Sequence, residues 1–217
     1  MVSNFEAAES YIKSAVHIAI QPGKALKHDE NGDLKSIYDV SAIRFYLIFT
    51  ALLVIIQFLA FNDNQWNYRV GITLFGYTMV RMAIASFALW VVFRLLYKDA
   101  AKDAVLVNLF VTAAVSIPFA VVLILVLGPG VGNQIVSSCS TKSASLAGDS
   151  QLLILSIFGI LASVAYIVYP FLILRSLGYE FTLLILPFIA FNLIYEIFVK
   201  QLTVVHLTNF LCNSLQL

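Results

Sequence analysis

Five long apolar stretches constrain this chain more than any other feature of its sequence. About twenty apolar residues in an α-helix cover a hydrocarbon core about 30 Å thick. A backbone inside lipid must satisfy its own hydrogen bonds, and none of the stretches shows the two-residue alternation of a barrel strand. The sequence therefore predicts an all-α integral membrane protein with a bundle of five transmembrane helices. They occupy residues 45–61, 70–93, 104–127, 152–174 and 181–199.

The composition agrees with a chain embedded in a membrane. Of the 217 residues, 61% are hydrophobic and 12% are charged, and the mean hydropathy is +0.92. Soluble domains carry about a quarter charged residues, so this chain has too few polar side chains to cover a water-exposed surface. We expect three segments: cytoplasmic residues 1–40, a five-span membrane domain of residues 41–200, and an external helical segment of residues 201–217.

The first twenty residues carry the pattern of an amphipathic helix. Apolar residues recur at intervals of three and four around Glu6, Glu9 and Lys13, up to the Pro22-Gly23 pair. This periodicity predicts a helix that lies at the cytoplasmic membrane interface and supports the bundle; recruitment of a partner is the alternative. The polar stretch 24–39 that follows predicts a loop or turn before the first span.

The distribution of lysine and arginine predicts the orientation. Nine of these residues fall in the N-terminal segment and in the links after the second and fourth spans, and three fall on the opposite side. Because basic residues concentrate in cytoplasmic loops, we expect a cytoplasmic N-terminus and an external C-terminus, in a bacterial inner (plasma) membrane. The net charge is +1 and no long basic block is present, so we expect no nucleic-acid partner.

Arg81 is the most unusual residue within the apolar stretches. It lies near the middle of the second predicted span, where an unpaired charge is costly. We expect Glu196 in the fifth span to pair with it; a water-filled or lipid-headgroup cavity, an anion site or a gate is the alternative. Asn192 and Lys200 share a helical face with Glu196. Asn108 in the third span is a further polar candidate inside the membrane.

The sequence contains no recognisable pattern of catalytic or metal-binding residues. It has no HExxH, GxSxG, P-loop or GxGxxG motif, and its two cysteines and three histidines are scattered. We therefore expect no catalytic activity, cofactor or metal. Cys139 in the third link and Cys212 near the C-terminus fall on the same external side of the predicted topology. A disulfide between them and two free thiols are both compatible with that placement.

The order of these elements resembles the Yip (Ypt/Rab-interacting protein) domain family and its bacterial relatives over about residues 10–200. The resemblance rests on the amphipathic opening 12–25 with its Pro22, on the sequence FRLLYK at residues 93–98, and on Ser116-Ile117-Pro118. Residues 36–40 read SIYDV, in place of the Asp-Leu-Tyr-Gly-Pro motif of the eukaryotic members. The resemblance implies a non-catalytic membrane protein that self-associates or binds partners.

Two functional hypotheses follow from these features. The first is a scaffold or accessory subunit of a membrane assembly, which contacts membrane lipids and other membrane-protein subunits or further copies of itself. The second is a small homo-oligomeric channel or transporter. Its pathway would be lined by Arg81, Asn108, Ser116 and Asn192. The hypotheses differ in whether ion or solute flux depends on Arg81.

Overall fold

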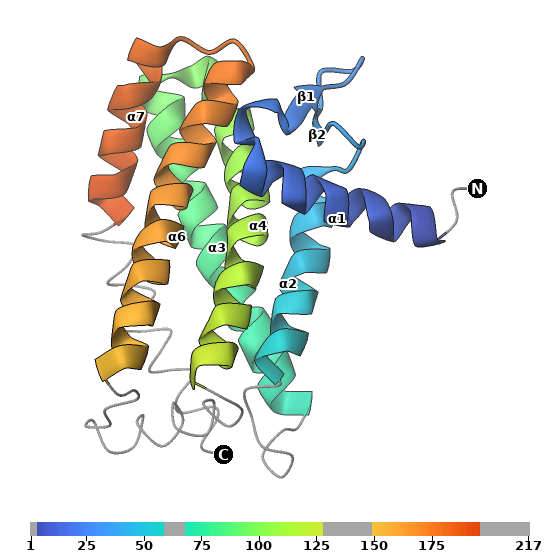
Figure 1. The fold of residues 1–217 in the computed structure, drawn as a ribbon. Coiled ribbons are helices and arrows are strands. Elements are labelled where there is room, and N and C mark those ends of the chain that lie inside the picture. Colours follow the sequence, from blue (N-terminus) through green and yellow to red (C-terminus); the bar gives the residue numbers. More distant parts are fainter. Residues whose placement is uncertain (1–3, 59–67, 128–148, 196–217) are drawn as a thin grey trace.

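The computed structural model describes residues 4–58, 68–127 and 149–195, and this part of the chain is mostly helical. Helices α2, α3, α4, α6 and α7 run side by side as a bundle, and α1 crosses the bundle near one end (Figure 1). Helix α4 is central, because it packs extensively against both α2 and α6. The helices are α1 (Asn4–Ile20), α2 (Ala42–Phe58), α3 (Tyr68–Leu96), α4 (Ala101–Leu127), α6 (Asp149–Ser176) and α7 (Phe181–Ile194).

Three helices in the described part of the chain are long and apolar enough to cross a membrane. The corresponding segments are Phe75–Leu96, Lys98–Val122 and Ile157–Ser176. Helices α2 and α7 contain shorter apolar segments, Ala42–Ile56 and Phe181–Ile194. The structure thus confirms a helical chain suited to a membrane, and the total of five spans stays a prediction.

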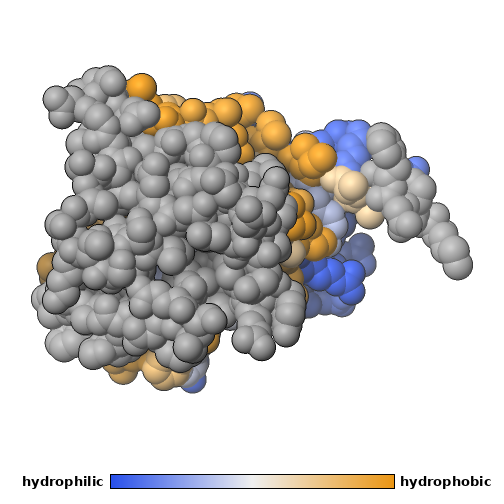
Figure 2. All heavy atoms as spheres, turned by 90° about the horizontal axis from the view of Figure 1, so that it is seen from below, coloured by the Kyte–Doolittle hydropathy of each residue, from blue (hydrophilic) through white to orange (hydrophobic). Residues whose placement is uncertain are grey.

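The outer surface of the bundle is apolar. Viewed from the end opposite α1, hydrophobic residues border the bundle, and hydrophilic residues gather where the N-terminal segment projects (Figure 2). Many large apolar side chains exposed in this way are unfavourable in water and are typical of a surface in contact with lipid or another protein. Large exposed side chains on α6 and α7 include Ile160, Leu161, Val164, Leu186, Ile189 and Leu193.

The predicted amphipathic segment forms α1, which ends at Ile20, just before the Pro22 turn. Ser14 and Ile18 lie on the buried face of α1, toward the rest of the chain. Ile12, Val16 and Ile20 are exposed and, at a spacing of four residues, form a row along its outer face. Helix α1 therefore has apolar residues on two faces, and its position at a membrane interface stays a prediction.

The polar stretch predicted as a loop or turn contains a turn that joins the two strands of a β-hairpin. Strands β1 (Leu26–His28) and β2 (Leu34–Ser36) pair antiparallel, with Leu26 opposite Ser36. The turn uses Gly32 at a φ of 77°, a conformation that glycine adopts without strain. The two strands were not predicted, because strands of three residues are too short to show a two-residue periodicity.

The turn of this hairpin is further fixed by Asp29. Its Oδ1 accepts hydrogen bonds from the backbone N–H groups of Asn31 and Asp33, both at 2.9 Å. Its Oδ2 lies 2.6 Å from the Lys35 Nζ, and this contact lowers the pKa of Asp29 to about 2. The carboxylate therefore remains ionised through the physiological pH range and holds the turn closed.

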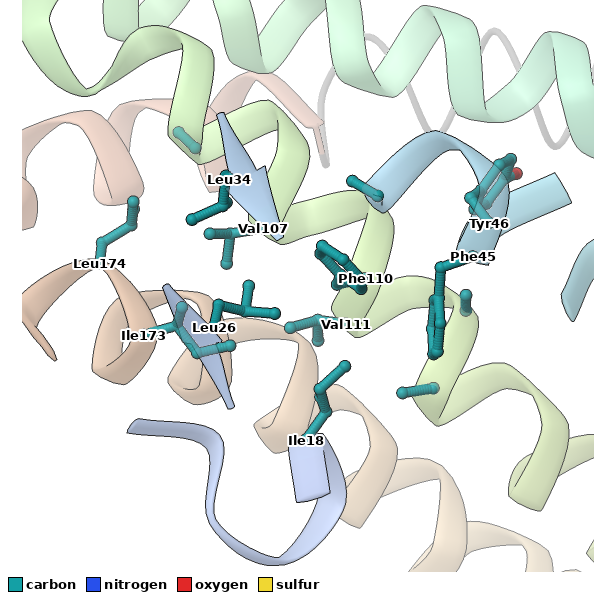
Figure 3. Close-up of a cluster of buried hydrophobic side chains, with 14 of the residues drawn as sticks. Ile18, Leu26, Leu34, Phe45, Tyr46, Val107, Phe110, Val111, Ile173 and Leu174 are labelled. Carbon is teal, nitrogen blue, oxygen red and sulfur yellow. The ribbon is translucent and has the colours of Figure 1, made fainter. Parts of the chain in front are cut away.

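The main hydrophobic core lies where the N-terminal segment meets α2, α4 and α6 (Figure 3). The Phe45 ring stacks on Phe49, with centroids 4.2 Å apart, and contacts Phe110 at 5.0 Å. The ring of Tyr11 in α1 also stacks on Phe45, with centroids 6.4 Å apart. The core thus joins α1 to the bundle. Its other buried members include Ile18, Leu26, Leu34, Val107, Val111, Ile173 and Leu174.

Candidate functional site

Two clusters of polar side chains stand out against this apolar background. The first, which we call the cap cluster, consists of His28, Asp103 and Tyr179 and lies where the hairpin meets the end of the bundle. The second, the Arg81 cluster, lies within the helices and consists of Arg81, Tyr46, Ser116, Tyr166 and Tyr195. We use "cap" for residues 4–41, which comprise α1, the Pro22–Lys24 turn and the hairpin.

Asp103 is the centre of the cap cluster. It lies in the first turn of α4, where the helix dipole favours a carboxylate, and only 4% of its surface is exposed. Its Oδ2 is 2.6 Å from His28 Nε2 of β1, and it accepts a hydrogen bond of 2.9 Å from the Tyr179 hydroxyl. One buried carboxylate therefore joins the hairpin, α4 and the link between α6 and α7.

The end of α6 brings Tyr179 into this cluster. Gly178 has a φ of 96°, and the backbone N–H of Tyr179 donates to the carbonyl oxygen of Leu174. This is the glycine C-cap that reverses the chain direction after a helix. The reversal directs Tyr179 toward α4, where its hydroxyl also lies 3.3 Å from the backbone oxygen of Asp99. Its ring packs edge-on against Tyr97.

Ser36 supplies a second buried polar contact between parts of the cap. Its hydroxyl accepts a hydrogen bond of 2.8 Å from Ser14 of α1. It also accepts the backbone N–H groups of Tyr38 and Val40, and Ser36 is fully buried. Because buried polar groups with satisfied hydrogen bonds specify one arrangement, these contacts fix α1 on the hairpin.

Two further contacts hold the cap on the bundle. The Tyr169 hydroxyl of α6 donates to the backbone oxygen of Ala19, at 3.0 Å. Lys102 of α4 forms an ion pair with Asp33 in the hairpin turn, at 3.0 Å. The ion pair is exposed and adds little stability, whereas the tyrosine bond fixes the C-terminal end of α1.

Tyr179 should make the folded protein sensitive to alkaline pH. Burial raises the pKa of Tyr179, and the hydrogen bond to Asp103 and its negative charge raise it further. The folded state thus holds the phenolic proton more tightly than the unfolded chain does. The resulting stabilisation is complete below the unfolded pKa of about 10 and is lost as the pH rises above it.

We therefore expect Tyr179→Phe to flatten the decrease in melting temperature between about pH 9 and 11, measured by thermal unfolding in detergent. Tyr38→Phe, a substitution in the cap away from Asp103, is the matched control and should leave the wild-type slope. Equal slopes for wild type and Tyr179→Phe would contradict this account of the cap cluster.

Arg81 forms the centre of the second cluster. Its Nη2 donates to the Tyr195 hydroxyl at the C-terminal end of α7, at 3.3 Å. Its charge also acts on the hydroxyl of Tyr166 in α6 and on that of Tyr46 in α2. Tyr166 in turn lies 3.0 Å from the Ser116 Oγ of α4. All five helices of the bundle therefore contribute a polar side chain to this cluster.

Of the other site residues predicted from the sequence, some lie in the described part of the chain and some lie outside it. Glu196, the expected partner of Arg81, lies outside the described residues, as do Cys139 and Cys212. Asn192 donates a hydrogen bond of 2.8 Å to the backbone oxygen of Phe188 in its own helix. Asn108 is half-buried in α4. The pairing of Arg81 with Glu196 and the disulfide therefore stay predictions.

The sequence did not reveal the hydroxyl groups around Arg81 or the roles of Asp103 and Tyr179. Tyrosines are frequent in the apolar stretches, and nothing in their spacing sets Tyr166 and Tyr195 apart. Asp103 carried one usable signal, because an acidic residue at the start of an apolar helix is typical of a helix N-terminus. Within the described ranges, no group of three or more histidine, cysteine, aspartate or glutamate side chains could hold a metal ion.

Comparison of the chain with protein-family models, with curated proteins and with solved structures finds no match. The functional proposals therefore rest on the geometry of the two clusters.

Proposed function

We propose that this protein is a non-catalytic scaffold or accessory subunit of a membrane assembly. The observation that carries this proposal is the attachment of the cap to the bundle at two points. The buried Asp103 carboxylate of α4 binds the hairpin, and the Tyr169 hydroxyl of α6 binds the end of α1. Within the cap, the buried Ser36 hydroxyl joins the hairpin to α1. A segment held in this way presents one fixed surface, which lowers the entropic cost of binding a partner.

In this proposal the bundle spans the membrane five times, and the cap faces the cytoplasm of a bacterium. The exposed apolar residues Ile12, Val16 and Ile20 support an α1 that lies along the membrane interface. The apolar sequence of α2 continues to residue 61 and that of α7 to residue 199, which gives both the length of a span. In this proposal the resemblance of the sequence to the Yip domain family implies partners among membrane-protein subunits or further copies of the chain.

Release of the cap should remove partner binding without preventing membrane insertion. We suggest purification from native membranes in a mild detergent, with quantitative mass spectrometry of the wild type and of the double variant His28→Ala/Ser36→Ala. We expect one stoichiometric membrane-protein partner, or a second copy of the chain, with the wild type and at least about a tenfold lower yield with the double variant. Such a loss corresponds to about 1.4 kcal/mol in binding.

Lys27→Ala is the control variant for this experiment. Lys27 pairs with Asp39 within the cap, and both side chains are exposed, so its loss should leave cap attachment unchanged. A wild-type protein that is monomeric and lacks a stoichiometric partner would contradict the scaffold proposal. Equal partner yields for the double variant and the control would contradict the role of the cap.

The Arg81 cluster favours a second candidate function, a small homo-oligomeric channel or transporter. A fixed positive charge among hydroxyl groups from several helices is typical of a polar pathway through a membrane. Flux of ions or solutes into proteoliposomes that depends on Arg81 would support this candidate. Proteoliposomes without flux would leave the scaffold as the function.

A further inference from the structure

Arg81 brings a permanent positive charge into the helical bundle. Among the residues that the structure describes, no carboxylate forms an ion pair with it, and its one described hydrogen bond is to the neutral hydroxyl of Tyr195. A neutral hydroxyl does not cancel the charge. A charged group at this depth is stabilised by a counter-charge or by water, so the described neighbours of Arg81 leave part of its charge uncompensated.

The groups around Arg81 offer more donors than acceptors. A guanidinium has five N–H donors and no acceptor. The hydroxyl of Tyr46 lies near Thr50 but makes no hydrogen bond of normal geometry with the described residues, and only 7% of Tyr46 is exposed. A buried hydroxyl that lacks a partner is costly, so this region is best matched by a group rich in acceptors.

The Arg81 side chain is not fully enclosed by the chain, so part of its guanidinium is free to contact a ligand. The neighbouring hydroxyls come from helices on different sides: Tyr166 from α6 and Tyr195 from α7. A planar guanidinium binds two oxygens of a carboxylate or phosphate in parallel, and tyrosine hydroxyls add further donors. The chemical class that fits is an oxyanion.

We propose that the Arg81 cluster is a binding site for an oxyanion, supplied either by a phospholipid headgroup or by a small soluble anion. Arg81 provides the charge and the bidentate contact, and the hydroxyls of Tyr195 and Tyr46 complete the donor set. The site does not depend on the scaffold function. If the protein is a channel or transporter, this site means that the transported solute is an oxyanion.

The test measures the melting temperature of the full chain in nanodiscs. Two conditions are compared with phosphatidylcholine alone: added inorganic phosphate, and phosphatidylglycerol mixed into the bilayer. We expect the wild type to gain about 5 °C or more when the ligand is in a hundredfold excess over its Kd. A gain with inorganic phosphate identifies a soluble oxyanion as the source, and a gain with phosphatidylglycerol alone identifies a headgroup.

Two variants show whether the gain arises at this site. Arg81→Gln should abolish it, whereas Arg94→Gln, which removes another exposed arginine near the end of α3, should retain it. If Arg81→Gln does not fold, Arg81→Lys should weaken binding at least about tenfold, because lysine lacks the bidentate fork. No gain in the wild type, or an equal gain in the Arg81 variants, would overturn the proposal.

Glu196→Gln addresses the competing occupant, which is the carboxylate next to Tyr195 in the sequence. If the wild type shows no gain and Glu196→Gln does, the chain fills the site with its own carboxylate, and the proposal is wrong. If both show the gain, an external oxyanion binds with Glu196 present. None of these outcomes affects the partner pull-down, so failure of this site and failure of the scaffold function are distinguishable.

Discussion

Replacement of His28 by alanine should lower the free energy of unfolding by about 2 to 3 kcal/mol, because the buried Asp103 carboxylate loses the shorter of its two side-chain hydrogen bonds. The hydroxyl of Tyr179 would remain as the one described side-chain partner of the same oxygen, Oδ2. Equilibrium unfolding of the purified protein in mixed micelles measures the change. Lys27→Ala, one residue earlier in β1, is the control and should change stability by less than about 0.5 kcal/mol.

A double-mutant cycle with Asp103→Asn isolates the contact from other effects of the substitution. We expect a coupling energy of about 1 kcal/mol or more between positions 28 and 103, since the two side chains are in direct contact. Additive effects of the two substitutions would show that the hydrogen bond adds no stability and that His28 acts through packing alone.

Replacement of Phe45 by alanine should be still more destabilising, by about 3 to 5 kcal/mol. The Phe45 ring is fully buried and contacts Phe49, Phe110 and Tyr11, which belong to α2, α4 and α1. Its loss would leave a cavity at the junction of the cap and the bundle. The same unfolding experiment measures the change, and faster proteolysis of α1 should accompany it.

Phe87→Ala is the size-matched control for this prediction. Phe87 of α3 is 66% exposed, so its removal leaves no cavity and should cost less than about 1 kcal/mol. Similar losses of unfolding free energy for both variants would mean that the buried Phe45 ring stabilises the protein no more than the exposed Phe87 ring does. A small loss for Phe45→Ala alone would mean that the neighbouring rings close the cavity.

The sequence located the described helices well because apolar length is a local property. The predicted spans 104–127 and 152–174 correspond to α4 (Ala101–Leu127) and α6 (Asp149–Ser176). The periodicity of the first twenty residues likewise predicted α1, which ends at Ile20. The ends differ by about three residues, since polar residues extend a helix beyond its apolar part.

The candidate sites were less predictable. Arg81 was recognisable because a charge in an apolar stretch is unusual whatever surrounds it. Its hydrogen bond to Tyr195 crosses 114 positions of the sequence, and the bond between His28 and Asp103 crosses 75. No spacing rule along a single helix or strand relates residues so far apart.

From the sequence alone, it follows that this chain is a helical protein suited to a membrane, where its described helices lie to within about three residues, and which charge lies among apolar residues. These properties follow from hydropathy and from periodicity within one segment. The pairing of residues 26–36 into a hairpin, the joining of three segments by Asp103 and the bond from Arg81 to the Tyr195 hydroxyl came from the tertiary structure. Those features depend on which helix faces meet, and that choice is made by the packing of the whole bundle.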